Sequence, residues 1–171
     1  MENEIEKKEV NKFEKLKDFF KDNIKIFLSI FIVIIIALFC AIYFNYHNEK
    51  KNEKISEKYI KAGIYLSSAD KKNSKKIYEE IVQAKNKFYS PLALGNIIEN
   101  ELENDNEKVL KLFKVVEDIK MSKNDKDLVK LKKALYLKKH FKDAEGNKLL
   151  QDIISENSIW KDAALEVLKQ N

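Results

Sequence analysis

The sequence is poor in cysteine, proline and glycine and has no arginine. Its 171 residues include one Cys, one Pro and three Gly, and all 33 basic residues are lysine. A single cysteine, Cys40, excludes a disulfide framework within one chain. The three isolated glycines provide no glycine-rich loop for phosphate. The absence of arginine disfavours nucleic-acid recognition, because bidentate contacts to bases and phosphates favour guanidinium. The lysines are mixed with 28 acidic residues, which is typical of solvated helix faces.

Residues suited to catalysis are also scarce. His47 lies at the edge of an apolar run and His140 lies in a polar stretch, and neither has the spacing of a metal-ligand motif. The acidic residues of 99–105 alternate with Asn and Leu, as expected for a solvated helix end or turn. No nucleophile, base and orienting group occur at a recognisable spacing. We therefore expect no enzymatic activity, no cofactor, no metal site, no nucleic-acid partner and no small-molecule substrate.

The longest hydrophobic run predicts a membrane-spanning helix. Residues 26–44 read IFLSIFIVIIIALFCAIYF without a charge, and Asn45 and Tyr46 extend the segment to 26–46. At about 1.5 Å per residue the segment is roughly 30 Å long, which matches the hydrocarbon core of a bilayer. A cleaved signal sequence would be shorter and would end at a small-residue site. A lipoprotein signal would need a small residue before Cys40, where Phe39 stands. We therefore interpret the segment as an uncleaved single-pass anchor.

Residues 1–25 form a charged leader with seven lysines and seven acidic residues. Phe13, Leu16 and Phe20 recur at helical spacing, which predicts a weakly amphipathic helix at the membrane surface. Lysine counts give little information on orientation. Residues 11–25 and 47–61 carry five each, and windows of twenty residues carry seven and five, which slightly favours a cytoplasmic N-terminus.

Residues 47–171 are predicted to form an all-α domain. They have no alternating β-branched run bounded by turn signals, so strands are not expected. Apolar residues recur at spacings of three and four, the period of amphipathic helices. Polar stretches at 70–74, 104–106, 122–125 and 140–143 interrupt the pattern. The predicted order is helix, turn, helix, repeated three times, with one helix left over. Ser90-Pro91 is the clearest helix start, because serine caps free N–H groups and proline fits the first turn.

The helical pairs repeat at a regular interval. Tyr78, Phe113 and Leu149 lie in the middle of each second helix, 35 and 36 residues apart. A period near 34 made of paired helices is typical of tetratricopeptide-type solenoids, whose pairs bury their apolar faces by stacking. An irregular helical bundle is the alternative. Trp160, followed by Ala163 and Ala164, indicates a closing helix that packs on the last pair.

Several short segments carry a resemblance to a known family. Ala62-Gly63 and Leu94-Gly95 resemble the apolar-glycine pair in a repeat's first helix, where the missing side chain lets two helices approach. Asp143-Ala144 resembles the small position that opens a repeat's second helix. Residues 158–164 are similar to a tryptophan-then-alanine ending. On these segments the chain resembles the membrane-anchored tetratricopeptide-like family typified by YfgM, an ancillary subunit of the SecYEG translocon. Leu131-Lys132 departs from the pattern, because a glycine is expected there.

The resemblance implies a bacterial inner-membrane protein with a cytoplasmic N-terminus and a periplasmic domain. Its expected partners are the Sec translocon, a periplasmic chaperone or an exported polypeptide. The alternative is a scaffold or assembly factor for another inner-membrane or envelope complex. In stacked helical pairs the first helices line a concave surface that accepts a partner's helix or extended segment. The repeat register places six residues in this groove: Leu92, Asn96, Glu99, Val129, Lys133 and Tyr136.

Overall fold

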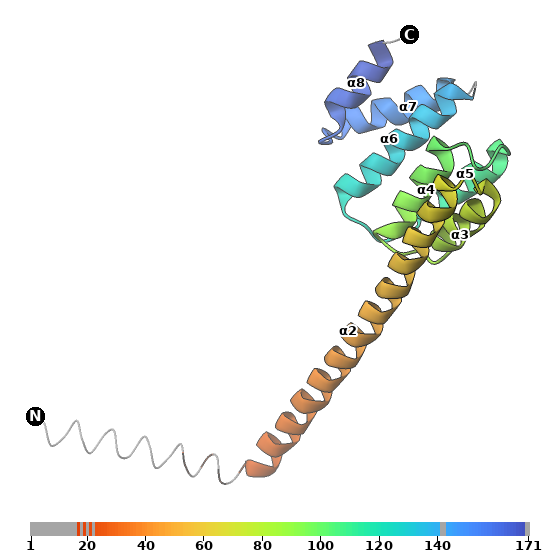
Figure 1. Cartoon of the computed structure of the whole chain (residues 1–171). Helices are drawn as coiled ribbons and strands as arrows, with labels where there is room; N and C mark the ends of the chain where they lie inside the picture. The colour runs from red at the N-terminus through yellow and green to blue at the C-terminus, as the bar shows by residue number, and fades with distance from the viewer. Residues whose placement is uncertain (1–16, 18, 20, 22, 141–142, 170–171) are drawn as a thin grey trace, which may run out of the picture. The chain divides into compact units, whose positions relative to one another are not determined.

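The computed structural model describes residues 17, 19, 21, 23–140 and 143–169. The predicted amphipathic helix of the leader, with Phe13, Leu16 and Phe20, lies outside the described residues. The chain divides into two compact units, residues 1–50 and 51–171. The described part is helical without strands (Figure 1). Its helices are α2 (Ile24–Ser67), α3 (Lys71–Gln83), α4 (Tyr89–Glu99), α5 (Asn106–Glu117), α6 (Lys123–Lys139), α7 (Asp143–Ser155) and α8 (Lys161–Lys169).

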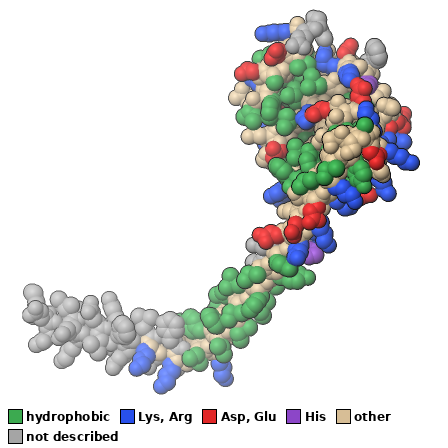
Figure 2. All heavy atoms as spheres, in the orientation of Figure 1, with side chains coloured by type: hydrophobic (Ala, Val, Ile, Leu, Met, Phe, Trp, Pro, Cys, Tyr) green, Lys and Arg blue, Asp and Glu red, His purple; other side chains and the backbone are tan. Residues whose placement is uncertain are grey.

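The first unit contains the apolar segment 26–46, which is helical over its whole length as part of α2. The helix is long and apolar enough to cross a membrane, and a signal sequence near an N-terminus would meet the same criteria. Figure 2 shows hydrophobic side chains along the visible side of this segment. At its C-terminal end the ring of Tyr43 stacks on His47 with centroids 6.3 Å apart, and the Lys50 ammonium lies 5.6 Å from the Tyr46 ring.

The second unit has the predicted order of helical pairs. The part of α2 from residue 51 onward is followed by α3, α4 by α5, and α6 by α7, and α8 remains as the closing helix. Buried residues form one cluster around Tyr78, Ile97 and Phe113, and a second cluster around Leu150 and Ile153. The prediction of an all-α, tandem-pair domain is therefore confirmed for the described residues.

The three repeat positions all lie near the middle of their helices, and they differ in burial. Tyr78 and Phe113 are 2% and 0% exposed. In α7 the fully buried residue is Leu150, while Leu149 is only partly buried. Half-buried Trp160 packs against the second cluster, as predicted, and its indole N–H donates to the carbonyl oxygen of Asn124 at 3.0 Å. This bond ties the start of the closing helix to the first turn of α6.

Two predicted helix boundaries were wrong because other side chains act as caps. The polar stretch 70–74 was expected to be a break, but α3 already begins at Lys71, since the Asp70 carboxylate accepts from the backbone N–H of Asn73 at 3.1 Å. Ser90 does not cap α4. Its buried hydroxyl donates to the carbonyl oxygen of Ile81 at 2.6 Å, while the Asn86 side-chain oxygen accepts the first free N–H groups.

Four helix ends in the described part use a residue other than glycine in the left-handed conformation. Ala69, Lys85, Glu101 and Asn157 have positive φ angles of 60°, 51°, 49° and 49°. This left-handed conformation usually ends a helix at glycine, which has no Cβ to clash with the backbone. After α4 the N–H of Leu102 donates to the carbonyl oxygen of Ile97 at 2.9 Å, which closes a Schellman-type end. A side chain at such a φ angle strains the backbone, and the strain is tolerated here at the short turns that follow the helices.

The close approach of helices also depends on a different glycine from those expected. A Cβ on Gly63 would meet only the Tyr78 hydroxyl at 3.8 Å, and one on Gly95 would meet the flexible end of Lys132 at 2.8 Å. A Cβ on Gly146 of α7 would lie 2.9 Å from the backbone oxygen of Ala134 in α6. The expectation that Gly63 and Gly95 allow close helix contact is therefore wrong. Gly146 has that role, between α6 and α7.

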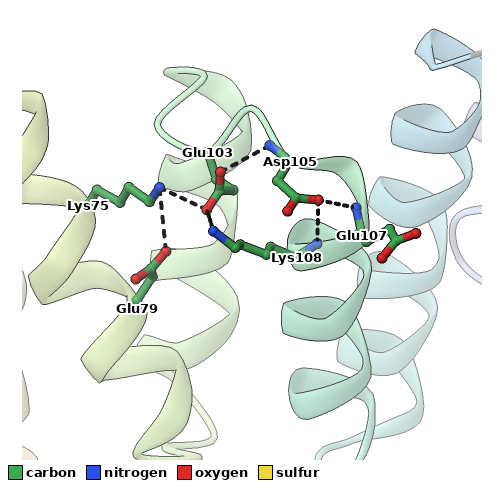
Figure 3. A network of polar contacts seen from close by, with 6 residues as sticks. All are labelled: Lys75, Glu79, Glu103, Asp105, Glu107 and Lys108. Carbon is green, nitrogen blue, oxygen red and sulfur yellow. Dashed lines mark hydrogen bonds and ion pairs between the residues drawn. The ribbon is translucent and has the colours of Figure 1, made fainter.

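A polar network lies where α3, the α4–α5 loop and α5 meet (Figure 3). The Glu103 side chain is 6% exposed, and one of its oxygens lies 2.8 Å from the Lys75 ammonium and 3.8 Å from that of Lys108. Its other oxygen accepts from the backbone N–H of Asp105 at 3.0 Å. The Lys75 contact and the Asp105 bond lower the pKa of Glu103 from 4.5 to about 2. The network thus holds an ionised carboxylate in a nearly buried position.

Candidate protein-binding cleft

A cleft of about 630 Å³ opens between the start of α4, the α5–α6 loop and the first half of α6. We call it the α4–α6 cleft. Its volume is within the range of about 300–1,000 Å³ that is usual for ligand pockets. Figure 2 shows hydrophobic side chains grouped on the visible face of the helical domain, with lysines and carboxylates around them. The apolar residues that line the cleft are Phe88 before α4, Pro91, Leu92 and Leu94 in α4, Phe113 in α5, Met121 in the loop, and Leu128 and Val129 in α6.

The α4 side of the cleft is shaped by the cap that starts this helix. The Asn86 side-chain oxygen accepts from the N–H groups of Phe88 and Tyr89 at 3.0 and 2.9 Å. The two aromatic rings meet edge to face with centroids 4.9 Å apart. The Tyr89 ring packs inward against Tyr59 at 5.6 Å, which leaves Phe88 62% exposed at the cleft. A large aromatic side chain in this position is available for contact with a partner.

The α6 side begins at Ser122, the N-cap residue of this helix. The N–H of Asp125 donates to the Ser122 hydroxyl oxygen at 3.2 Å, and that hydroxyl donates to the Asp125 carboxylate at 2.6 Å. The helix that starts here presents half-buried Leu128 and buried Val129 to the cleft. The cleft therefore lies between the first helices of two neighbouring pairs.

The charged residues of the cleft are mainly lysines. Lys132 lies 3.3 Å from the Glu99 carboxylate. Lys87 and Lys120 are exposed and have no ion pair within the described part of the chain. Asp125 is the acidic residue among the described residues of the lining, and its carboxylate accepts from the Ser122 hydroxyl at 2.6 Å. The lining therefore has unneutralised positive charge.

The structure brings together some of the predicted groove residues. Leu92 and Val129 both line the α4–α6 cleft, and Glu99 lies beside it through its ion pair with Lys132. Asn96 is half-buried and its amide donates to the Tyr59 hydroxyl at 2.8 Å.

The other two predicted residues lie away from this cleft. The Lys133 ammonium donates to the Glu117 carboxylate of α5 at 2.8 Å. Tyr136 is 7% exposed and borders a separate pocket of about 250 Å³. Its hydroxyl donates to the Asn106 side chain at 2.7 Å, and its ring lies 4.3 Å from that of His140. Burial, followed by the charges of Asp105 and Glu103, raises the pKa of Tyr136.

The sequence did not predict four residues of the cleft lining: Phe88, Met121, Lys87 and Lys120. Phe88 precedes the helix start that was predicted at Ser90, and Met121 lies in a connection between helices. A register drawn along helix faces therefore could not include either residue. The adjacent aromatic residues Phe88 and Tyr89, just before a proline, were the one available signal.

Comparison with protein-family models gives a match to the tetratricopeptide repeat-like domain over residues 17–158. The matched range includes the apolar segment, all the helices from α2 to α7 and the whole α4–α6 cleft. Comparison with curated proteins and with solved structures finds no match.

Proposed function

Because the chain belongs to the tetratricopeptide repeat-like domain family, we propose that it is a membrane-anchored module that binds other proteins through the α4–α6 cleft. Stacked helical repeats are a protein-interaction fold, and their surfaces accept helices or extended segments. The observation that carries the proposal is the exposure of Phe88 and Leu92, 62% and 38%, in a cleft of about 630 Å³. Large apolar side chains in such a cleft are typical of sites that bind a partner.

The membrane anchor is supported by the first unit. Among the residues whose burial is described, none in its most apolar window is buried. The core helix of a soluble protein would be covered, whereas a bilayer would cover this segment along about 30 Å. The segment is also longer than the apolar region of a typical cleaved signal, which is about 7–15 residues. We propose a single span with the N-terminus in the cytoplasm and the helical domain in the periplasm.

The proposed partners are the Sec translocon and a periplasmic chaperone, with the protein as a link between them. This assignment is supported by the resemblance to the YfgM-like family. Protease treatment of intact spheroplasts tests the topology, because a periplasmic domain is digested there. Protection of the domain would contradict the periplasmic assignment.

Site-specific photo-crosslinking in membranes tests the partner and the cleft together. A photoreactive residue at Leu92 should capture a Sec component or a periplasmic chaperone, identified by mass spectrometry. The same residue at Lys111, which is exposed on α5 and outside the cleft, is the matched control. Capture of only unrelated proteins at Leu92 would remove the Sec assignment. Equal capture at both positions would remove the cleft as the binding site.

Co-purification in mild detergent tests the alternative, a scaffold for another envelope complex. A stable stoichiometric complex without Sec components would favour the scaffold.

A further inference from the structure

We infer that the α4–α6 cleft binds an acidic amphipathic segment, in which two or three large apolar side chains are flanked by Asp or Glu. This inference rests on the proposed function and adds the chemistry of the partner. Two features of the cleft carry it. The first is an apolar floor, formed by Phe88, Leu92, Met121 and Leu128. The second is a pair of lysines, Lys87 and Lys120, that have no ion pair within the described residues.

The apolar floor determines what enters the cleft. Phe88 and Leu92 contribute exposed surface from the α4 side, and half-buried Met121 and Leu128 face them from the loop and from α6. A volume of about 630 Å³ is too large for one methyl group and is comparable to sites that hold a drug-sized group. An amphipathic helix offers side chains of this total size at positions i, i+3 or i+4, and i+7.

The lysines determine what flanks those side chains. Lys87 and Lys120 lie in the lining on the connections before α4 and before α6, and neither has an ion pair within the described residues. Beside an apolar surface a charge is less screened than in bulk water, so a carboxylate on the partner is favoured. A basic segment would meet two like charges and would be rejected. Lys132 adds less to this selection, because Glu99 already neutralises it at 3.3 Å.

Fluorescence anisotropy with the full-length protein in zwitterionic nanodiscs tests the inference. The probes are four labelled peptides of equal length: apolar with acidic flanks, apolar with neutral flanks, apolar with basic flanks, and acidic with serine in place of leucine. We expect the acidic apolar peptide to bind about tenfold or more tightly than the basic one, with an affinity that falls as salt rises. The serine peptide should bind weakly, because it cannot fill the floor.

A charge-reversal pair locates the effect. The double variant K87E/K120E should lose about tenfold in affinity for the acidic apolar peptide and gain affinity for the basic one. The matched control is K111E/K114E, which changes the net charge equally. Lys111 and Lys114 are exposed on α5, outside the cleft, and have no ion pair in the described part. The control should leave both affinities unchanged, and circular dichroism should show the same helicity in both variants.

Each outcome decides between the two proposals. Equal binding of acidic and basic peptides, or an equal effect of the two double variants, would overturn the acidic-segment inference. Failure of all four peptides, while Leu92 still captures a protein in membranes, would overturn the inference and leave the proposed function standing. Selective peptide binding without capture from Leu92 would support the chemistry of the cleft and contradict the proposed cellular role.

Discussion

Replacing Glu103 by glutamine should destabilise the helical domain at neutral pH and reduce its sensitivity to acid. The Glu103 carboxylate is nearly buried, pairs with Lys75 at 2.8 Å and accepts from the N–H of Asp105. Glutamine keeps an oxygen that can accept from Asp105 but loses the charge. Lys75 keeps a partner in Glu79 at 4.0 Å, so the substitution does not leave a buried cation unpaired.

The magnitude follows from the pKa of Glu103. A fall from 4.5 to about 2 corresponds to about 3 kcal/mol, since each tenfold change in proton affinity is about 1.4 kcal/mol. Solvent screening at the partly exposed lysines reduces the expected contribution to about 2 kcal/mol. The folded-state pKa is below the ordinary value, so this stabilisation is present above about pH 4.5 and is lost as the pH falls towards about 2. The E103Q variant should lack this part of the acid-induced loss.

Urea unfolding of the full-length chain in detergent micelles measures the effect, with the fluorescence of the single Trp160 and far-ultraviolet circular dichroism as probes. The matched control is Glu101→Gln, because Glu101 pairs with Lys139 at 2.8 Å but its side chain is 67% exposed. The control should unfold like the wild type. Equal stabilities of E103Q and wild type at neutral pH, or equal acid profiles of the two, would refute the assignment of this carboxylate as a stabilising group.

Four further substitutions test the packing, each by the same urea unfolding. Gly146→Ala should cost about 1 kcal/mol despite a better helix propensity, because its Cβ would lie 2.9 Å from the backbone oxygen of Ala134. Gly63→Ala should instead stabilise by about 0.5–1 kcal/mol, because its Cβ would have ordinary contacts. Ala69→Gly should stabilise by roughly 0.5–1 kcal/mol, since φ is 60° there. Asp127→Ala should stabilise by about 1 kcal/mol, because Asp127 is 3% exposed and one carboxylate oxygen has no hydrogen-bond partner among the described residues. A change of opposite sign in any of them would contradict the local geometry described for that residue.

The order of helices could be predicted from the sequence because its signals are local. Apolar residues at helical spacing and short polar breaks determine which segments form helices and where they turn. The positions of Tyr78 and Phe113 could be predicted in the same way, because stacked pairs repeat their buried positions. The full burial of Leu150 in place of its neighbour Leu149 could not, since it depends on how α7 packs in the second cluster.

Helix caps were harder to predict because several polar residues compete for each free N–H group. The sequence offers both Asn86 and Ser90 near the start of α4, and either side chain can accept such a bond. Ser90 instead bonds a carbonyl oxygen of α3, a contact that exists only after α3 and α4 have packed.

The six groove residues remain a prediction of a binding site. Leu92 and Val129 both line the α4–α6 cleft, because they occupy the first helices of neighbouring pairs. Asn96 and Tyr136 were expected at the surface, but their polar atoms bond other side chains of the domain. The contribution of Phe88 came from outside the regular helices and had no periodic signal. Which polar residues remain free for a partner depends on tertiary contacts that periodicity does not encode.

The binding role of the α4–α6 cleft is tested most directly by two leucine substitutions in the full-length protein. Leu92 is 38% exposed inside the cleft and Leu135 is 43% exposed outside it, so an aspartate in either place should leave the fold intact. After affinity purification in mild detergent, the Leu92→Asp variant should lose the proteins that co-purify with the wild type, and Leu135→Asp should retain them. Retention by both variants, or loss from both, would contradict the assignment of this cleft as the binding site.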